Sequence, residues 1–262
     1  MSFMKFDGAR ALITGASSGI GRSLAQALAA RGARVGLLAR RREELDSLAK
    51  ELRAKGTDAF VETADISVRA DAEAAARSLA QELGGVDLLV NNAGYGHHRR
   101  FLDWEVEDME RMMRVNYFGS LYTTKALLPQ MVKRGSGTIV FMASVAGRIA
   151  PPDESAYAAS KFAMVGLAES ISLELEEHGI HVLTVCPGAI RTPFFDEEAL
   201  ERMPKVAKKS MVPVEDLVAS VLKALERGAH EVTYPGFIRA GYVMRALAPS
   251  FTRAQVRRTT MP

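Results

Sequence analysis

The chain has 262 residues, of which 48% are hydrophobic and 25% are charged, a composition that suits one folded α/β domain with a sizeable core and excludes an intrinsically disordered chain. The 34 basic and 31 acidic residues almost balance, so the charge does not indicate a nucleic-acid-binding protein. A single cysteine, Cys186, excludes an internal disulfide framework, and no apolar run suits a membrane span or a secretory signal, so we expect a cytoplasmic protein.

The first expected elements are a strand, a glycine-rich turn and a helix. Residues 9–14 form a short apolar run that leads into Gly15, Gly19 and Gly21, and an amphipathic pattern then continues to Gly32. Glycines permit tight backbone geometry and the close approach of a phosphate. The N-terminus of the following helix offers unpaired N–H groups and a positive dipole end to that phosphate. The turn therefore predicts a nucleotide site in the first βαβ unit.

The second expected strand, over residues 34–39, ends at Arg40 and Arg41, where a helix over residues 41–55 begins. No acidic residue stands between this strand and Glu43. In a dinucleotide site, an acidic residue at the end of this strand binds the ribose 2′-hydroxyl, whereas arginine suits a 2′-phosphate. We therefore expect NADP(H) rather than NAD(H).

A third expected strand, over residues 59–63, ends at Asp65 and Ile66. We expect the Asp65 carboxylate to accept the adenine amino group and Ile66 to pack on the adenine ring. A helix over residues 68–83 and a strand over residues 86–90 follow. This alternation of strands and helices predicts an α/β fold with a parallel, doubly wound sheet.

A long helix is expected over residues 105–134, with Asn116 in its middle and Pro129 marking a kink or the approach of its end. The apolar neighbours of Asn116 favour burial over an exposed polar position, and a buried amide needs hydrogen-bond partners, so we expect a polar network there. A strand over residues 138–143 ends at Ser144, which would face the ligand crevice of an open α/β sheet.

Tyr157 and Lys161 form a candidate acid–base pair. They are four residues apart in a helix that is expected to continue to about His178, so they share one face. A phenol has a pKa near 10, and a nearby ammonium favours the phenolate and lowers that pKa. An isolated pair with this spacing is more often two surface residues. A sixth strand is expected over residues 180–185.

Together these residues resemble the short-chain dehydrogenase/reductase family over roughly residues 6–235. The resemblance rests on Thr14-Gly15-x-x-x-Gly19-x-Gly21, Asp65, Asn91-Asn92-Ala93-Gly94, Asn116, Ser144, Tyr157-x-x-x-Lys161 and Pro187-Gly188, in the order of the family and at its separations. It implies a single Rossmann domain over residues 1–262, with about seven parallel strands and helices on both faces. It also implies an oxidoreductase with a nicotinamide cofactor.

The resemblance implies roles for four catalytic residues. Tyr157 would exchange a proton with the substrate oxygen, and Lys161 would lower the tyrosine pKa and hydrogen-bond the nicotinamide ribose. Ser144 would hold the substrate oxygen, and Asn116 would anchor a water through which protons reach Lys161. The protein would thus supply orientation and a matched acid for the hydride chemistry of the cofactor.

The resemblance also implies the cofactor site. The pyrophosphate would lie on the glycine-rich turn, the 2′-phosphate on the arginines, and the two nucleosides on the ends of the other strands. The residues expected at this site are Gly15, Ser17, Ser18, Gly19, Ile20 and Gly21 at the turn, Arg40, Arg41, Asp65 and Ile66 at the adenosine phosphate and adenine, Asn91, Ala93 and Gly94 beside the adenosine ribose, and Tyr157, Lys161, Pro187, Gly188, Ile190 and Thr192 at the nicotinamide end.

Residues 192–212 are expected to form a substrate lid, which would exclude water when it closes. The apolar side chains of this segment suggest a hydrophobic carbonyl substrate, unless they pack on the protein itself. The adjacent His97 and His98 have no convergent ligand spacing, so we expect no metal there and a solvated loop at the edge of the cleft.

The segment over residues 236–262 is the least typical of the family. A helical projection over residues 237–258 separates apolar residues from arginines, and no acidic residue follows Glu231. The segment can pack on a second subunit in a homodimer or homotetramer, or lie on an anionic membrane surface. We favour subunit packing, although Pro249 interrupts the helix and weakens both interpretations.

The sequence thus predicts an NADPH-dependent carbonyl reductase, or the reverse alcohol dehydrogenase, that acts on an apolar small molecule with Tyr157 as general acid and base. One alternative is an NAD-linked dehydrogenase of hydroxy compounds. Another is a non-catalytic nucleotide-sensing or scaffold protein on the same fold, which would have no evident need for Asn116, Ser144, Tyr157 and Lys161 together. No nucleic-acid partner is expected.

Overall fold

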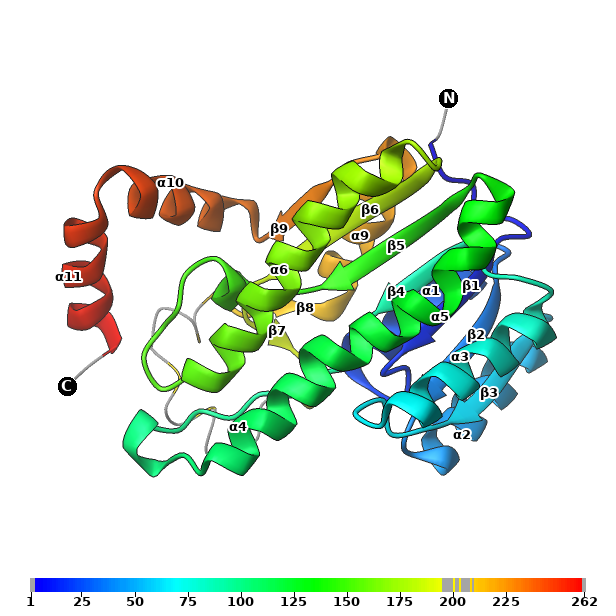
Figure 1. The fold of residues 1–262 in the computed structure, drawn as a ribbon, viewed down its shortest axis with the longest axis horizontal. Helices are drawn as coiled ribbons and strands as arrows, with labels where there is room; N and C mark the ends of the chain where they lie inside the picture. Colours follow the sequence, from blue (N-terminus) through cyan, green and yellow to red (C-terminus); the bar gives the residue numbers. More distant parts are fainter. Residues whose placement is uncertain (1–2, 195–199, 201–202, 204–207, 209, 261–262) are drawn as a thin grey trace.

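The computed structural model describes residues 3–194, 200, 203, 208 and 210–260, and its centre is one parallel sheet of seven strands (Figure 1). The strands are β1 (Arg10–Thr14), β2 (Arg34–Ala39), β3 (Ala59–Thr63), β4 (Leu88–Asn91), β5 (Gly137–Met142), β6 (Ile180–Pro187) and β9 (Glu231–Tyr234). Their order is β3-β2-β1-β4-β5-β6-β9, and each pairing is parallel. The expected doubly wound sheet of about seven strands is therefore confirmed.

Helices cover both faces of this sheet. They are α1 (Gly19–Ala29), α2 (Arg42–Ala54), α3 (Arg69–Leu83), α4 (Val106–Met113), α5 (Gly119–Arg134), α6 (Ser155–Glu176) and α9 (Val214–Arg227). The helices α1, α2 and α9 share one buried apolar cluster with the sheet, and α3, α5 and α6 share a second cluster on the opposite face. Because both faces are covered, the strands read as nearly continuous apolar runs rather than as alternating patterns.

The long helix expected over residues 105–134 is interrupted in the structure. The helix α4 ends at Met113, Arg114–Phe118 form a π-helical turn, and α5 continues from Gly119. A π turn contains one extra residue and is frequent at functional sites. The fully buried Asn116 lies in this turn. Pro129 lies inside α5, which continues past it to Arg134.

Short elements surround the carboxyl ends of the strands. They are η1 (Phe101–Asp103), η3 (Val145–Gly147), β7 (Ile190–Arg191), β8 (Val212–Pro213) and η4 (Gly236–Ile238). The strands β7 and β8 pair, so the two ends of the expected lid over residues 192–212 are held together. Most of that lid, residues 195–199, 201–202, 204–207 and 209, lies outside the described residues.

The chain ends in two helices, α10 (Arg239–Leu247) and α11 (Pro249–Thr260). Figure 1 shows them projecting away from the layered body, at the end of the molecule where α4 also begins. None of the described helices has both the length and the apolar composition that a bilayer crossing requires.

Candidate active site

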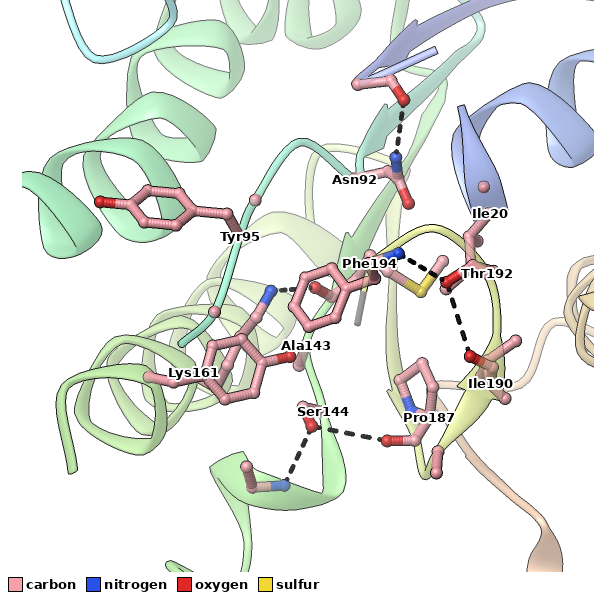
Figure 2. A pocket seen from close by; sticks show the side chains of 18 of the residues that line it. Ile20, Asn92, Tyr95, Ala143, Ser144, Lys161, Pro187, Ile190, Thr192 and Phe194 are labelled. Carbon is pink, nitrogen blue, oxygen red and sulfur yellow. Dashed lines mark hydrogen bonds between the residues drawn. The ribbon is translucent and has the colours of Figure 1, made fainter. Parts of the chain in front are cut away.

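The carboxyl ends of the parallel strands open into a cavity of about 780 Å³, a size typical of small-molecule sites. Open α/β sheets bind ligands at this edge because the loops after several strands meet there. Figure 2 shows side chains from several of these loops around one space. The predicted site residues that line the cavity are Gly15, Ser17, Ser18, Gly19, Ile20, Arg40, Arg41, Asp65, Ile66, Ala93, Gly94, Ser144, Tyr157, Lys161, Pro187, Gly188, Ile190 and Thr192.

The glycine-rich turn is held tightly against the end of β4. Asn92 Nδ2 donates a hydrogen bond to the Thr14 carbonyl oxygen at 3.0 Å. Thr14 Oγ1 accepts hydrogen bonds from the backbone N–H groups of Asn92 and Ala93, each at 3.0 Å. Gly15 has a φ of +68°, and a Cβ at this position would lie 2.8 Å from Ala93 Cα. Only glycine combines this backbone conformation with this close approach.

The helix α1 begins at Gly19 directly after the turn. Gly21 was expected at the cofactor site but does not line the cavity. A Cβ at this position would lie 2.3 Å from the Gly15 carbonyl oxygen, so glycine here lets α1 pack closely on the turn. Within this fully described segment, Ser18 forms no side-chain cap and the first turn of α1 contains no acidic residue. The N–H groups of that turn can therefore bind a phosphate, which the helix dipole also favours.

Arg41 reaches back from the start of α2 over this turn. Its Nη2 donates hydrogen bonds to Ser17 Oγ at 3.0 Å and to Ser18 Oγ at 2.7 Å. Arg40 also lines the cavity and is exposed. Arg41 thus contacts the glycine-rich turn directly, whereas the charge of Arg40 acts on Asp65.

Asp65 lies on the Arg40 side of the cavity, next to Ile66. Burial raises the pKa of the Asp65 carboxyl, but hydrogen bonds from Ser67 and the charge of Arg40 outweigh burial and hold that pKa below its usual range. The Ser67 N–H and hydroxyl donate to Asp65 Oδ1 at 2.9 Å and 2.7 Å. The carboxylate is therefore ionised at neutral pH and can accept a further hydrogen bond.

Asn91 lies behind the cavity wall, unlike the expectation from the sequence. Its Nδ2 donates to Thr124 Oγ1 at 2.8 Å, and its Oδ1 accepts a hydrogen bond from Thr123 Oγ1 at 2.6 Å. Successive strand residues point to opposite sides, so Asn92 rather than Asn91 lines the cavity. Asn91 instead anchors the end of β4 to α5.

Asn116 also lies behind the wall, where it joins three segments. Its Oδ1 accepts a hydrogen bond from the Tyr95 N–H at 3.0 Å, and its Nδ2 donates to the Tyr95 carbonyl oxygen and to Ser160 Oγ, each at 2.9 Å. The expected polar network is therefore present. A Cβ on Gly94 would lie 3.0 Å from Asn116 Oδ1 and 3.6 Å from Lys161 Nζ, so both groups lie beside this glycine.

Ser144, Tyr157 and Lys161 meet at one side of the cavity. Ser144 follows β5, and the other two side chains come from one face of α6. Ser144 Oγ accepts a hydrogen bond from the Ala146 N–H at 3.1 Å (Figure 2). Lys161 Nζ donates to the Met142 carbonyl oxygen at 2.7 Å and lies 5.7 Å from the centre of the Tyr157 ring. The arrangement places a phenol, a hydroxyl and an ammonium around one small space.

Comparison with known proteins identifies this arrangement. The chain matches the family model of the short chain dehydrogenases over residues 9–203. The chain belongs to this family. The oxidoreductase UcpA of Salmonella typhimurium is 41% identical over 201 residues, or 76% of each chain. A short chain dehydrogenase of Drosophila melanogaster, named dehydrogenase/reductase SDR family protein 7-like, is 38% identical over 251 residues, which cover 91% of this chain and 76% of the relative.

Two solved structures of dehydrogenases have the same fold. One from Mycobacterium marinum has a TM-score of 0.79 and 33% identity, over 87% of this chain and 95% of the other. An alcohol dehydrogenase from Thermococcus sibiricus, complexed with 5-hydroxy-NADP, has a TM-score of 0.77 and 28% identity, over 86% of this chain and 95% of the other. The protein is therefore an oxidoreductase of the short chain dehydrogenase family.

Short chain dehydrogenases use a nicotinamide cofactor, and the residues of this chain fit one. The glycine turn at Gly15 and the open N-terminus of α1 suit a pyrophosphate. The Asp65 carboxylate suits an adenine amino group, and Arg41 lies beside the turn. When bound, the nicotinamide supplies or accepts the hydride.

Burial governs the titration of Tyr157 and Lys161 in this short chain dehydrogenase. It raises the pKa of the Tyr157 phenol well above its usual value, although the Ser144 hydroxyl lowers it, and it lowers the pKa of Lys161 to about 8. The depression of the tyrosine pKa expected from the sequence is therefore not observed, because the cost of burying an ionised phenol outweighs the hydrogen bond of Ser144, and the charge of Glu154 also opposes ionisation. At pH 7 the tyrosine keeps its proton and the lysine is mostly charged.

Sequence patterns did not indicate the polar pair at the substrate end of the cavity. His98 Nδ1 lies 3.6 Å from Glu154 Oε1, and these side chains are only 12% and 19% exposed, so His98 is not solvated as expected. The Arg99 N–H donates a hydrogen bond to the Asp153 carbonyl oxygen at 2.8 Å, which joins the loop that carries His98 to the loop that carries Glu154. Burial, and then the charge of Asp153, raise the pKa of Glu154 to about 7. Glu154 is the N-cap residue of α6, three residues before Tyr157, and this spacing is the signal that could have placed Glu154 beside Tyr157.

Apolar side chains form much of the remaining wall. The Phe194 ring centre lies 5.8 Å from that of Tyr157, and Met203 also lines the cavity; both belong to the expected lid. Phe237 and Ile238 of η4 line it as well. The C-terminal segment therefore contributes to the cavity, which its sequence alone did not indicate.

Proposed function

We propose that the protein is an NADP(H)-dependent reductase of ketones, and in the reverse direction a dehydrogenase of secondary alcohols, with an apolar small molecule as substrate. The observation that carries this proposal is the convergence of Ser144, Tyr157 and Lys161 beside an apolar wall that includes Phe194 and Phe237. A hydroxyl, a phenol and an ammonium suit a carbonyl oxygen that becomes negative during reduction.

Tyr157 is the proton donor in this proposal. Burial keeps the phenol protonated at pH 7 because it raises the tyrosine pKa, so the acid is ready for a substrate oxygen that gains negative charge. The Lys161 ammonium stabilises the phenolate that remains after proton transfer. The same features favour the reductive direction, because oxidation requires the phenolate at the start.

Ser144 holds the substrate oxygen. Its Oγ accepts a hydrogen bond from the Ala146 N–H at 3.1 Å, and its bond to the Pro187 carbonyl oxygen is long, at 3.5 Å. The hydroxyl proton can therefore turn to a substrate oxygen at little cost. Asn116 positions the loop at Tyr95 and α6, and through α6 it supports both Tyr157 and Lys161.

The first experiment compares Tyr157→Phe with Tyr95→Phe, a change at another tyrosine that lines the cavity. We expect Tyr157→Phe to lower the turnover of a ketone screen, followed by NADPH absorbance, by about 10²–10⁴-fold. NADPH binding, measured by fluorescence, should persist in both variants. A non-catalytic sensor would show no turnover in the unmodified protein and would keep its output after Tyr157→Phe.

Preference for NADP(H) is supported by Arg41, which contacts Ser17 and Ser18, and by the binding of an NADP derivative to the Thermococcus sibiricus alcohol dehydrogenase. We expect Arg40→Asp and Arg41→Asp to move the ratio of kcat/KM values toward NAD(H). Arg42→Asp is the matched control, because Arg42 pairs with Asp46 on α2. An NAD-linked enzyme would keep its ratio in all three variants.

A further inference from the structure

A carboxyl and an imidazole lie together in the wall of the cavity, at its substrate end. His98 and Glu154 line the cavity together with Asp153 and Tyr157. The side chains of His98 and Glu154 are 12% and 19% exposed, and His98 Nδ1 lies 3.6 Å from Glu154 Oε1. Neither group takes part in the proposed proton transfer, so the role of this polar pair is open.

The two segments that carry this pair are anchored to the body of the protein. After His98, Trp104 Nε1 donates a hydrogen bond to the Arg99 carbonyl oxygen at 3.0 Å, and the buried Trp104 ring shares an apolar cluster with Ala156 of α6. The Glu154 carbonyl oxygen accepts a hydrogen bond from the Ala158 N–H at 2.7 Å. Groups that are already ordered lose less conformational entropy when a ligand binds to them.

The Glu154 carboxyl can take a further hydrogen-bond partner. Its distance of 3.6 Å to His98 Nδ1 is longer than a normal hydrogen bond. Within the described part of the chain, no hydrogen bond favours its ionised form, and burial together with the charge of Asp153 raises its pKa to about 7. Near neutral pH a large fraction of the carboxyl therefore carries a proton, so it can donate a hydrogen bond as well as accept one. A ligand that satisfies such a buried group gains affinity from it.

The charges at this end of the cavity narrow the class of ligand. Arg41 contacts the glycine-rich turn and Arg40 acts on the adenine side, so Lys161 is the one lysine or arginine at the substrate end among the described lining residues. Asp153 and Glu154 therefore oppose a carboxylate or a phosphate on the substrate. A neutral hydroxyl avoids this repulsion, and it can use both the donor and the acceptor of the polar pair.

An apolar stretch separates the polar pair from the reacting oxygen. A Cβ on Gly96 would lie 3.0 Å from Tyr157 Cδ2 and 3.2 Å from Phe194 Cζ, so the loop that leads to His98 packs on both rings. Glu154 is the N-cap residue of α6, three residues before Tyr157. Residues with this spacing on a helix are roughly 5–6 Å apart at Cβ. A compact apolar body can therefore present a ketone to Tyr157 and a hydroxyl to Glu154.

We propose that Glu154 and His98 bind a second polar group of the substrate, a neutral hydroxyl on an otherwise apolar ketone. The two residues determine specificity, because they contact the substrate away from the carbon that receives the hydride. The inference rests on the proposed function, since it places the ketone oxygen at Tyr157. It narrows the substrate class from apolar ketones to hydroxy ketones.

The test compares ketones of nearly equal size that differ in one polar group. They are acetophenones that carry a hydroxymethyl, an ethyl or an aminomethyl group at the meta or para position. With the unmodified protein and NADPH, kcat/KM for the hydroxymethyl compound should exceed that for the ethyl compound at least about tenfold, because the ethyl group leaves the buried carboxyl without a partner. Glu154→Leu should abolish this preference. Glu154→Gln should keep part of it, because an amide also donates and accepts hydrogen bonds.

Two further variants locate the effect. His98→Leu should lower the preference for the hydroxymethyl compound, because it removes the second member of the polar pair. Glu107→Leu is the matched control, since this exposed glutamate lies in the first turn of α4 and does not line the cavity; it should leave the preference unchanged. A loss of folded protein would lower kcat/KM for both compounds alike, so the ratio of the two values reports the contact itself.

Calorimetry on the NADPH complex of Tyr157→Phe separates this inference from the proposed function. It measures binding without turnover, and the dissociation constant of the hydroxymethyl compound should be at least about tenfold lower than that of the ethyl compound. Preferential binding with no turnover by the unmodified protein would contradict the proposed reaction and support the polar pair.

Two results would overturn the inference while the proposed reaction stands. One is a preference that is absent in the unmodified protein or persists in Glu154→Leu, which would show that the carboxyl does not contact the substrate. The other is a stronger preference for the aminomethyl compound, which would assign Glu154 to a cation instead of a neutral hydroxyl.

Discussion

Replacing Glu154 with glutamine should stabilise the protein in a pH-dependent way. The folded protein raises the pKa of Glu154 from 4.5 to about 7. Between these values the folded chain binds more protons at this site than the unfolded chain does, so stability falls as pH rises through the window. At about 1.4 kcal/mol per pKa unit, the ionised carboxyl lowers the free energy of unfolding by up to about 3 kcal/mol above pH 7. Below pH 4.5 it lowers this free energy by almost nothing.

Glutamine keeps the shape of this side chain and cannot ionise. Glu154→Gln should therefore raise the melting temperature at pH 8 by roughly 6–12 °C, given ~2–4 °C per kcal/mol for a chain of this size, and should have a much smaller effect at pH 5. Differential scanning calorimetry at both pH values measures the difference. Glu43→Gln, a change of an exposed carboxyl, is the control. Its effect on the melting temperature should be the same at pH 5 and at pH 8.

The groups that face Glu154 decide the sign of this effect. Asp153 and the buried site oppose ionisation, whereas His98 supports it if the imidazole is charged. A variant that is less stable than the unmodified protein at pH 8 would show that His98 holds Glu154 as an anion. That result would refute the reasoning.

Three further outcomes are expected. Gly21→Ala should weaken NADPH binding in a fluorescence titration by at least about tenfold, because the new Cβ would lie 2.3 Å from the Gly15 carbonyl oxygen, whereas Gly166→Ala meets no atom within 4 Å and should bind normally. Phe141→Ala, at a fully buried position in β5, should lower the free energy of unfolding in urea by about 3–5 kcal/mol. Turnover should decline as pH rises through about 8, where Lys161 loses its charge; a flat profile across that pH would contradict its role.

The sheet was predictable because parallel strands leave strong local signals. The ranges expected for the second and third strands, 34–39 and 59–63, match β2 and β3, since short apolar runs between turn residues and helices indicate buried strands. The proximity of Tyr157 and Lys161 was also predictable, because both residues lie on one helix, four positions apart.

Features that depend on register or on distant loops were not predictable. Asn91 and Asn92 are adjacent in sequence, and only the orientation of β4 decides which one lines the cavity. The pair of His98 and Glu154 forms because two loops meet through a backbone hydrogen bond. The tyrosine pKa was misjudged because the sequence shows the neighbouring charge but not the extent of burial.

The π turn at Arg114–Phe118 places one surplus residue between α4 and α5. Each residue of an α-helix turns the chain by about 100°, so this insertion offsets the angular phase of α4 from that of α5. Removing one residue from this turn would rotate Val106 and its acidic neighbours about the axis of α4. It would also move the Asn116 amide out of hydrogen-bond reach of Tyr95. A single inserted residue thus sets both the orientation of α4 and the position of the Asn116 side chain.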